Sequence, residues 1–248
     1  MKKLFLYVLL VCSPFLLQAQ NKKTLDSLLR LNNVYLKKDT VKIKLLLDIH
    51  NTYVLFDSKT GLKYADEALE LAQTMHHPFF TATAQFQKGR SLQENGKLEE
   101  ALQLYTQSRQ YYESENKKHY NLGGVYMSIG NVYVLQQKTT LALHYLQKGL
   151  DFFLEQKQKR GAANAYLNLS ASYRQINDWG KADEALNQSE ALFRELKDNL
   201  RIAQVLIKRG RTQFDTGNYQ RALDLFLKAL QLQDESIHSS TLYEIYAL

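Results

Sequence analysis

The sequence is poor in cysteine and proline. Among its 248 residues there are only one Cys and two Pro. A single cysteine excludes a disulfide framework and a zinc site built from thiolates. Two prolines leave little room for the many turns of an all-β domain. Because 45% of the residues are hydrophobic and 11% are aromatic, the chain can form a substantial core and is not expected to be disordered.

The first nineteen residues have the pattern of a secretory signal peptide. Met1 to Lys3 is a basic start, residues 4–17 are almost entirely apolar, and Ala19 is a small residue at which a signal peptidase could cut. The apolar run is shorter than the roughly 20 residues that span a bilayer, and no later stretch approaches that length. We therefore expect residues 1–19 to be removed. The mature chain would then lack cysteine, contain no membrane-inserted segment and reside in the periplasm or cell envelope.

Five segments of the chain repeat one pattern of small and large residues. Each contains an alanine, a large apolar residue four positions later and a small residue three positions after that. In four of the five segments, another small residue stands twelve positions before the alanine. The alanines are 36 to 41 residues apart, at Ala65, Ala101, Ala142, Ala182 and Ala222. Such a period is typical of an array of helical repeats.

Small residues at fixed spacing indicate closely packed pairs of antiparallel helices. Two helices approach closely where side chains are small, and large residues from the neighbouring helix fill the remaining space. Glycine inside a helix costs about 0.5–1 kcal/mol relative to alanine, so the recurrence of Gly89, Gly130 and Gly210 needs a reason in packing. A phosphate-binding loop is excluded as that reason, because the sequence has neither G-x-G-x-x-G nor G-x-x-x-x-G-K-[ST].

These residues resemble the tetratricopeptide repeat (TPR) family, in which a small residue on a first helix is followed by a glycine turn and then by Ala, an aromatic residue and Ala. The best match is Gly210 to Ala229, with Gly217 to Tyr219 in the turn and Phe226 as the aromatic. The resemblance covers roughly Val41 to Glu235, although the units are longer than the usual 34 residues and most lack the closing proline of the family. It implies an all-α fold, a right-handed α-solenoid of antiparallel helix pairs.

We expect five TPR-like helix-turn-helix repeats over residues 39–238. Turns are predicted at Thr60-Gly61, Asn95-Gly96, Asn177-Asp178 and Thr216-Gly217, because Gly and Asn adopt the conformations that end a helix. The predicted helices lie at about 24–36, 41–56, 60–76, 79–95, 97–115, 118–136, 138–156, 160–176, 179–197, 200–215 and 218–235.

The two ends of the array differ. Residues 20–38 are expected to form an N-terminal capping helix. At the other end, Ser239-Ser240 resembles an N-cap, so residues 239–248 are interpreted as the start of a further repeat or capping helix that is truncated. Because a solenoid normally needs a polar cap, this end suggests either a fragment of a longer protein or self-association through the uncapped surface.

No pattern of catalytic or metal-binding residues is evident. The six histidines lack the spacing of a metal site, and no nucleophile motif such as G-x-S-x-G is present. Carboxylate pairs such as Asp183-Glu184 are interpreted as solvated surface. Basic groups such as Lys208-Arg209-Arg211 are dispersed along helix edges, whereas nucleic acid would require one continuous basic face. We therefore expect no cofactor, no metal, no nucleic acid and no enzymatic activity.

The remaining candidate site is the groove that the first helices of TPR repeats line. There, apolar residues recur at one position, with Arg or Asn a turn further on. This arrangement suits a peptide whose side chains enter apolar pockets while Asn and Arg bind its carbonyls and carboxylates. The resemblance assigns the groove to Phe86, Arg90, Gln93, Met127, Asn131, Val134, Leu167, Arg174, Ile207, Arg211 and Phe214.

Two features qualify this assignment. Some of the eleven residues can instead pack between neighbouring helices. Family members that clamp a C-terminal carboxylate have Lys and Asn where this chain has apolar residues, which argues against that particular mode of binding.

We consider three functions for this chain. The first is a non-catalytic scaffold or adaptor, exported to the cell envelope, that binds a protein or peptide segment in the groove. The second is the extracytoplasmic sensor portion of a bacterial membrane signal transducer, a histidine kinase or transcriptional regulator whose output domain is absent from this sequence. This function is considered because the repeats of the chain are similar to those of such sensors. The third, an unrecognised hydrolase, would need a catalytic constellation that the sequence lacks.

Overall fold

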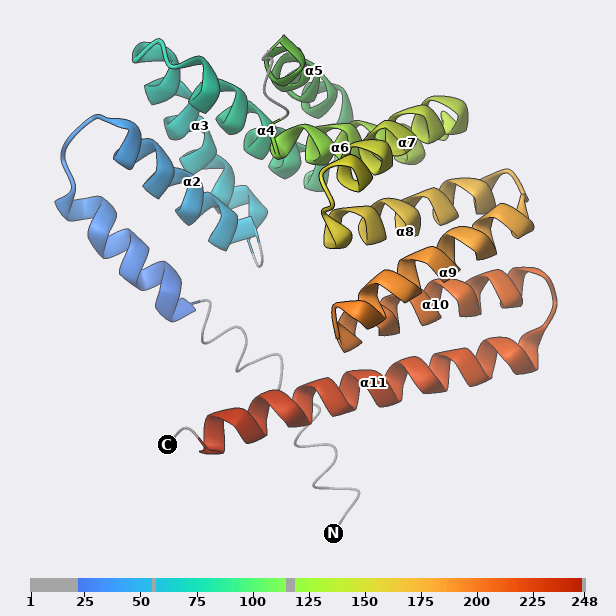
Figure 1. The fold of residues 1–248 in the computed structure, drawn as a ribbon. Coiled ribbons are helices and arrows are strands. Elements are labelled where there is room, and N and C mark those ends of the chain that lie inside the picture. Colours follow the sequence, from blue (N-terminus) through green and yellow to red (C-terminus); the bar gives the residue numbers. More distant parts are fainter. Residues whose placement is uncertain (1–21, 55–56, 115–118, 247–248) are drawn as a thin grey trace. The chain divides into compact units, whose positions relative to one another are not determined.

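The computed structural model describes the backbone of residues 22–54, 57–114 and 119–246, and side chains as far as residue 232. Every regular element in these ranges is a helix (Figure 1). None of these helices combines the length and apolar character needed to cross a membrane. The signal peptide predicted at residues 1–19 lies outside the described residues.

The helices follow the predicted order. A helix over residues 22–34 precedes α2, and each predicted helix up to α10 is present with its ends displaced by no more than three residues. The all-α class of antiparallel helix pairs is therefore confirmed. The bounds are α2 (Thr40–Val54), α3 (Ser58–Thr74), α4 (Pro78–Glu94), α5 (Leu98–Ser114), α6 (Asn121–Leu135), α7 (Thr139–Glu155), α8 (Lys159–Gln175), α9 (Trp179–Glu195), α10 (Asn199–Asp215) and α11 (Tyr219–Tyr246).

The chain divides into two compact units, Met1–Asn121 and Leu122–Leu248. In the first unit, α3 packs against both α2 and α4, and α4 packs against α5. Ile43, Ala72 and Phe80 belong to one core cluster of this unit. The helix over residues 22–34 buries Leu25 against α2.

The second unit contains α6 to α11. Neighbouring helices pack pairwise along the chain, α8 against α9 and α10 against α11, and α9 also contacts α10. A core cluster that includes Leu167, Phe193 and Leu206 joins α8, α9 and α10. Because side chains of three successive helices share this cluster, α8 and α10 are held close to each other. The candidate site described below includes residues of both helices.

The recurring glycines pack as the sequence predicts. A Cβ atom added to Gly89 would lie 2.6 Å from Cε1 of Tyr105, one added to Gly130 would lie 2.7 Å from Cγ of Leu146, and one added to Gly210 would lie 2.5 Å from Cε1 of Phe226. Real Cβ contacts are longer than this. Each glycine is therefore required by the large side chain of the second helix of its pair.

Three of the four predicted turns are confirmed. Gly96, Asn177 and Gly217 have φ values of 77°, 57° and 81°, in the left-handed region that ends a helix. The fourth prediction is wrong, because Gly61 lies inside α3. That helix begins after Asp57, whose carboxylate accepts a hydrogen bond from the backbone N–H of Thr60 at 3.0 Å.

The predicted helix break at Ser239-Ser240 is also wrong. α11 continues without interruption from Tyr219 to Tyr246. The physical reason is the absence of a helix breaker, since the sequence after Asn218 contains no Gly, Asn or Pro. Two serines in mid-helix do not suffice to end it.

Candidate functional site

Three apolar residues assigned to the groove are interior packing residues instead. Phe86, Met127 and Leu167 are only 9%, 7% and 5% exposed. The ring of Phe86 lies 5.9 Å from that of Tyr105, Met127 packs where Gly149 leaves space, and Leu167 belongs to the core cluster of α8, α9 and α10. The expectation that these side chains form pockets for a ligand is therefore corrected.

Of the other apolar residues, Ile207 is half-buried and packs against the same core cluster. Phe214 is 57% exposed, and its ring contacts that of Tyr219 edge-on with the centroids 5.2 Å apart. Val134 contributes its backbone carbonyl, which accepts a hydrogen bond from Nε2 of Gln175 at 3.3 Å. These residues do not form a row of pockets.

The polar groove residues of the first unit bond to their own neighbours. Oη of Tyr105 donates to Oε1 of Gln93 at 3.0 Å. Nη1 of Arg90 donates to Oε1 of Gln87 at 3.1 Å. Both side chains are thus engaged within their helix pair.

In the second unit, amide side chains connect α6 and α8. Nδ2 of Asn168 donates to Oδ1 of Asn131 at 2.9 Å, and Gln175 reaches the carbonyl of Val134 as described. Asn168 and Gln175 are seven residues apart and therefore share one face of α8. We call Asn131, Asn168 and Gln175 the amide row. Its members are half-buried or exposed, so the row is at the protein surface.

Beside the amide row, three cations gather between α8 and α10. Arg174 of α8 and Lys208 and Arg211 of α10 line one small pocket of about 20 Å³ with Ser170, Ala171 and Thr212. We call Arg174, Lys208 and Arg211 the basic cluster. Its members come from two helices because the C-terminal half of α8 lies beside the C-terminal half of α10, where Arg174 also meets Asp215, the last residue of α10. The structure thus brings together Arg174 and Arg211, both predicted from the sequence.

The basic cluster has more positive than negative charge. Nη1 of Arg174 forms an ion pair with Oδ2 of Asp215 at 2.6 Å. In the described part of the chain, neither Lys208 nor Arg211 has a carboxylate partner. Burial lowers the pKa of Lys208 below its ordinary value, and the charges of Arg211 and Arg174 lower it further.

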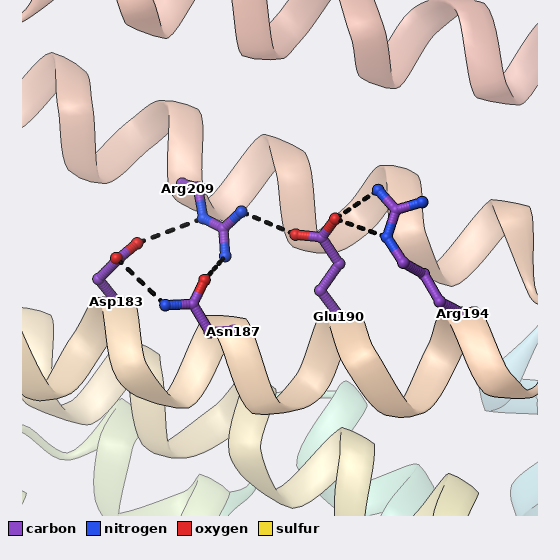
Figure 2. Close-up of polar contacts among 5 residues, drawn as sticks. All are labelled: Asp183, Asn187, Glu190, Arg194 and Arg209. Carbon is purple, nitrogen blue, oxygen red and sulfur yellow. Dashed lines mark hydrogen bonds and ion pairs between the residues drawn. The ribbon is translucent and has the colours of Figure 1, made fainter.

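Arg209, between these two cations in sequence, has a different environment (Figure 2). Its guanidinium points to α9, where Nη1 lies 2.7 Å from Oε2 of Glu190, Nη2 donates to Oδ1 of Asn187 at 2.6 Å and Nε lies 3.3 Å from Oδ1 of Asp183. Glu190 is also paired with Arg194. Asp183, interpreted from sequence as simply solvated, therefore belongs to a network that joins α9 to α10.

The sequence interpretation missed Asn168 and Gln175 of the amide row and Lys208 of the basic cluster. For Lys208, a signal was present in the sequence. This residue was grouped with Arg209 and Arg211 as a solvated helix edge. The available signal was the spacing of three residues between Lys208 and Arg211, which places both on one face of a helix, whereas Arg209 faces another side.

The site provides hydrogen-bond donors and positive charge. Amides can pair with backbone N–H and C=O groups, and guanidinium and ammonium groups can bind carboxylates.

In the described ranges, no group of three or more His, Cys, Asp or Glu side chains is placed to hold a metal ion. His77, one of the six histidines, instead caps α4, where its Nδ1 accepts from the N–H of Phe80 at 3.5 Å.

Comparison with solved structures finds similar folds at low sequence identity. BtubC (BKLC) from P. vanneervenii is 16% identical, with 88% of this chain and 90% of that chain covered and a TM-score of 0.67. Aspartyl phosphate phosphatase F from Bacillus subtilis is 14% identical, with 86% and 68% covered and a TM-score of 0.66. A Signal Transduction ATPase with Numerous Domains (STAND) protein with a tetratricopeptide repeat sensor, from Pyrococcus horikoshii, is 14% identical, with 92% and 36% covered and a TM-score of 0.69.

At such identities the likeness shows the fold alone. A search of curated protein sequences finds no match. The tetratricopeptide repeat family model, in contrast, matches residues 80–155, 120–195 and 161–235, which together span more than half of the chain. The chain belongs to the tetratricopeptide repeat family.

Proposed function

We propose that this chain is a non-catalytic scaffold that binds a protein or peptide segment on the face formed by α6, α8 and α10 of its second unit. The observation that carries the proposal is the amide row next to the basic cluster. Nδ2 of Asn168 on α8 donates to Oδ1 of Asn131 on α6 at 2.9 Å. Lys208 and Arg211, which have no carboxylate partner among the described residues, line the adjacent pocket with Arg174.

A peptide matches this chemistry better than a small apolar ligand does. Each amide side chain carries both donors and acceptors, so it can exchange its present partner for a peptide N–H or C=O at little cost. An apolar ligand would need an open hydrophobic pocket, but Met127 and Leu167 fill the positions where one was expected. Binding would then depend on polar contacts along an extended segment.

The setting that we propose for this scaffold is the cell envelope, where it would act as an adaptor. Support comes from the signal-peptide pattern of residues 1–19 and from the mature sequence, which lacks cysteine.

A second candidate is the extracytoplasmic sensor portion of a membrane signal transducer, a histidine kinase or transcriptional regulator. The specific observation that favours it is the likeness to the STAND protein from Pyrococcus horikoshii, in which a tetratricopeptide repeat unit serves as a sensor. In both candidates the same face would bind the partner. The likeness to the phosphatase from Bacillus subtilis concerns the fold, so we do not propose a phosphatase activity for this chain.

Site-specific photo-crosslinking in cells of the source organism tests the proposal. A benzoylphenylalanine placed at Asn168 should crosslink to one defined protein, identified by mass spectrometry. The control places the same residue at Gln188, which is exposed on α9. Equal crosslinking from the two positions, or none from Asn168, would contradict binding on this face.

A further inference from the structure

The basic cluster of the second unit suggests the chemistry of the partner. We infer that Arg174, Lys208 and Arg211 bind a side-chain carboxylate of an acidic peptide segment, and that Asp215 competes with this carboxylate for Arg174. The inference rests on the proposed function, because it takes the occupant of the face to be a peptide.

The first argument is the charge imbalance. Three cations line one pocket, but Asp215 is the only carboxylate in the described residues that pairs with any of them. Lys208 is half-buried, and a buried ammonium group beside two guanidinium groups is unfavourable unless an anion compensates it. An incoming carboxylate would supply that compensation.

The second argument is the size of the pocket and the nature of its floor. Ala171 contributes only a methyl group, and the hydroxyls of Ser170 and Thr212 already donate to the carbonyls of Leu167 and Lys208 at 2.7 and 3.2 Å. The floor therefore offers no competing charge. A volume of about 20 Å³ admits a group little larger than a water molecule, so a carboxylate fits at the mouth of the pocket but a nucleotide does not.

The third argument is that the positive charge is local. The neighbouring members of the face are the neutral amides Asn131, Asn168 and Gln175, which suit a peptide backbone. A nucleic acid would need cations along the whole face to follow successive phosphates, as well as aromatic rings on which bases stack. An acidic peptide needs only one such cluster, with hydrogen-bonding groups beside it.

The role of Asp215 follows from its exposure. The side chains of Arg174 and Asp215 are 37% and 36% exposed, so their ion pair is accessible to solvent and can be exchanged for another. While this pair is formed, one of the three cations is occupied. Removing the carboxylate of Asp215 should therefore strengthen the binding of an acidic ligand.

The test uses the mature chain and two labelled decapeptides, one alternating Glu and Ala and one alternating Gln and Ala. Both carry a C-terminal amide, so that side-chain carboxylates alone distinguish them. Fluorescence anisotropy at low salt should show binding of the Glu peptide and much weaker binding of the Gln peptide. Because one charge-assisted hydrogen bond is lost in each, Arg174→Ala, Lys208→Ala and Arg211→Ala should each weaken binding by about tenfold.

Asp215→Asn should tighten binding of the Glu peptide about threefold or more. Two controls reproduce these charge changes elsewhere on the surface. Arg221→Ala and Asp224→Asn alter exposed residues of α11 outside the cluster and should have little effect. Circular dichroism of every variant checks that the helices remain folded, and Lys208→Met provides a variant that keeps the buried stem of the side chain if Lys208→Ala does not fold.

Several results would overturn the inference. The first is equal affinity for the two peptides, and the second is tighter binding of an oligothymidine than of the Glu peptide. The third is an affinity of the cluster variants for the Glu peptide that equals that of Arg221→Ala, and the fourth is an affinity of Asp215→Asn that equals that of Asp224→Asn. If the crosslink from Asn168 identifies a partner while the Glu peptide fails to bind, the inference fails and the proposed function stands. Failure of the crosslink would count against the proposed function itself.

Discussion

Among the individual residues, His50 of α2 shows how burial controls charge. Its side chain is fully buried, and Nδ1 lies 3.2 Å from the carbonyl oxygen of Gly61. Nε2 has no hydrogen-bond partner among the residues that the structure describes. Burial is the main cause that lowers the pKa of His50 below its ordinary value. The charge of Arg90 lowers it further, while the Gly61 carbonyl and Asp66 partly oppose the shift. The folded first unit therefore favours a neutral imidazole that donates from Nδ1.

We predict that acid destabilises the chain through His50. The unfolded state gains a proton as the pH falls below about 6.5, whereas folded His50 resists protonation, so the free energy of unfolding should fall in this range. At higher pH both states are neutral and the stability is fully present. Urea unfolding between about pH 7.5 and about pH 5 measures the slope. His50→Asn, which keeps an amide donor for Gly61 but does not titrate, should reduce it.

The control for this prediction is His144→Asn, since His144 is exposed on α7. Some slope should remain in the His50 variant, because burial also lowers the pKa of His119 in the same unit. An unchanged slope in His50→Asn would show that the buried imidazole is not the source of acid sensitivity.

At the scale of elements, the contact between paired helices depends on glycine. In Gly130→Ala the added Cβ would meet Cγ of Leu146 at 2.7 Å and the backbone nitrogen of Leu146 at 3.2 Å. Because a backbone atom cannot move aside as a flexible side chain does, α6 and α7 would have to separate. We expect a loss of about 1–3 kcal/mol in the free energy of unfolding, measured by urea denaturation.

Gly180→Ala in α9 is the matched control. The nearest atom to its added Cβ is Oδ1 of Asp178, at 3.9 Å, so no clash occurs. This substitution should stabilise the chain by up to about 0.5–1 kcal/mol through helix propensity alone. If both variants gain stability, the recurring glycines would not be packing positions.

Helices and their pairing were largely predictable from sequence, while some turns were not. The spacing of small residues revealed the pairs because packing imposes it in every repeat. At Lys157 and Lys197, however, φ is 55° and 54° although neither is Gly or Asn. There the turn is imposed by the bond from the N–H of the following residue to a carbonyl five residues earlier, as from Gln158 to Phe153 at 2.8 Å. Such a bond uses only backbone atoms and leaves no signature in the side chains.

The candidate site was predicted in part, for a related reason. The repeat pattern places a residue along a helix, but the face that it occupies changes by about 100° for each position. Arg174 and Arg211 fall on the surface between α8 and α10, as expected, whereas Met127 and Leu167 turn into the core. Lys208 could be recognised only once α8 and α10 were placed side by side, since the pocket combines residues from both.

At the scale of the whole molecule, the export that we propose would decide where the basic cluster acts. Cleavage after Ala19 would remove Lys2 and Lys3 and change the formal net charge from +7 to +5, so the mature chain would remain basic. A chain outside the cytoplasm would meet envelope proteins rather than intracellular nucleic acids. Its net charge would also favour encounter with acidic segments, an effect that salt screens.

We predict that the chain is processed and retained in the cell envelope. Intact mass or N-terminal sequencing of protein from fractionated native cells should give Gln20 as the first residue. Ala19→Arg should block cleavage, because signal peptidase requires a small residue there, and should leave the precursor with the membrane. A soluble envelope band of the mature mass would favour the adaptor, and a much larger membrane band would favour the sensor of a transducer. An uncleaved chain in the cytoplasm would contradict both, and would make intracellular acidic proteins the partners to seek for the basic cluster.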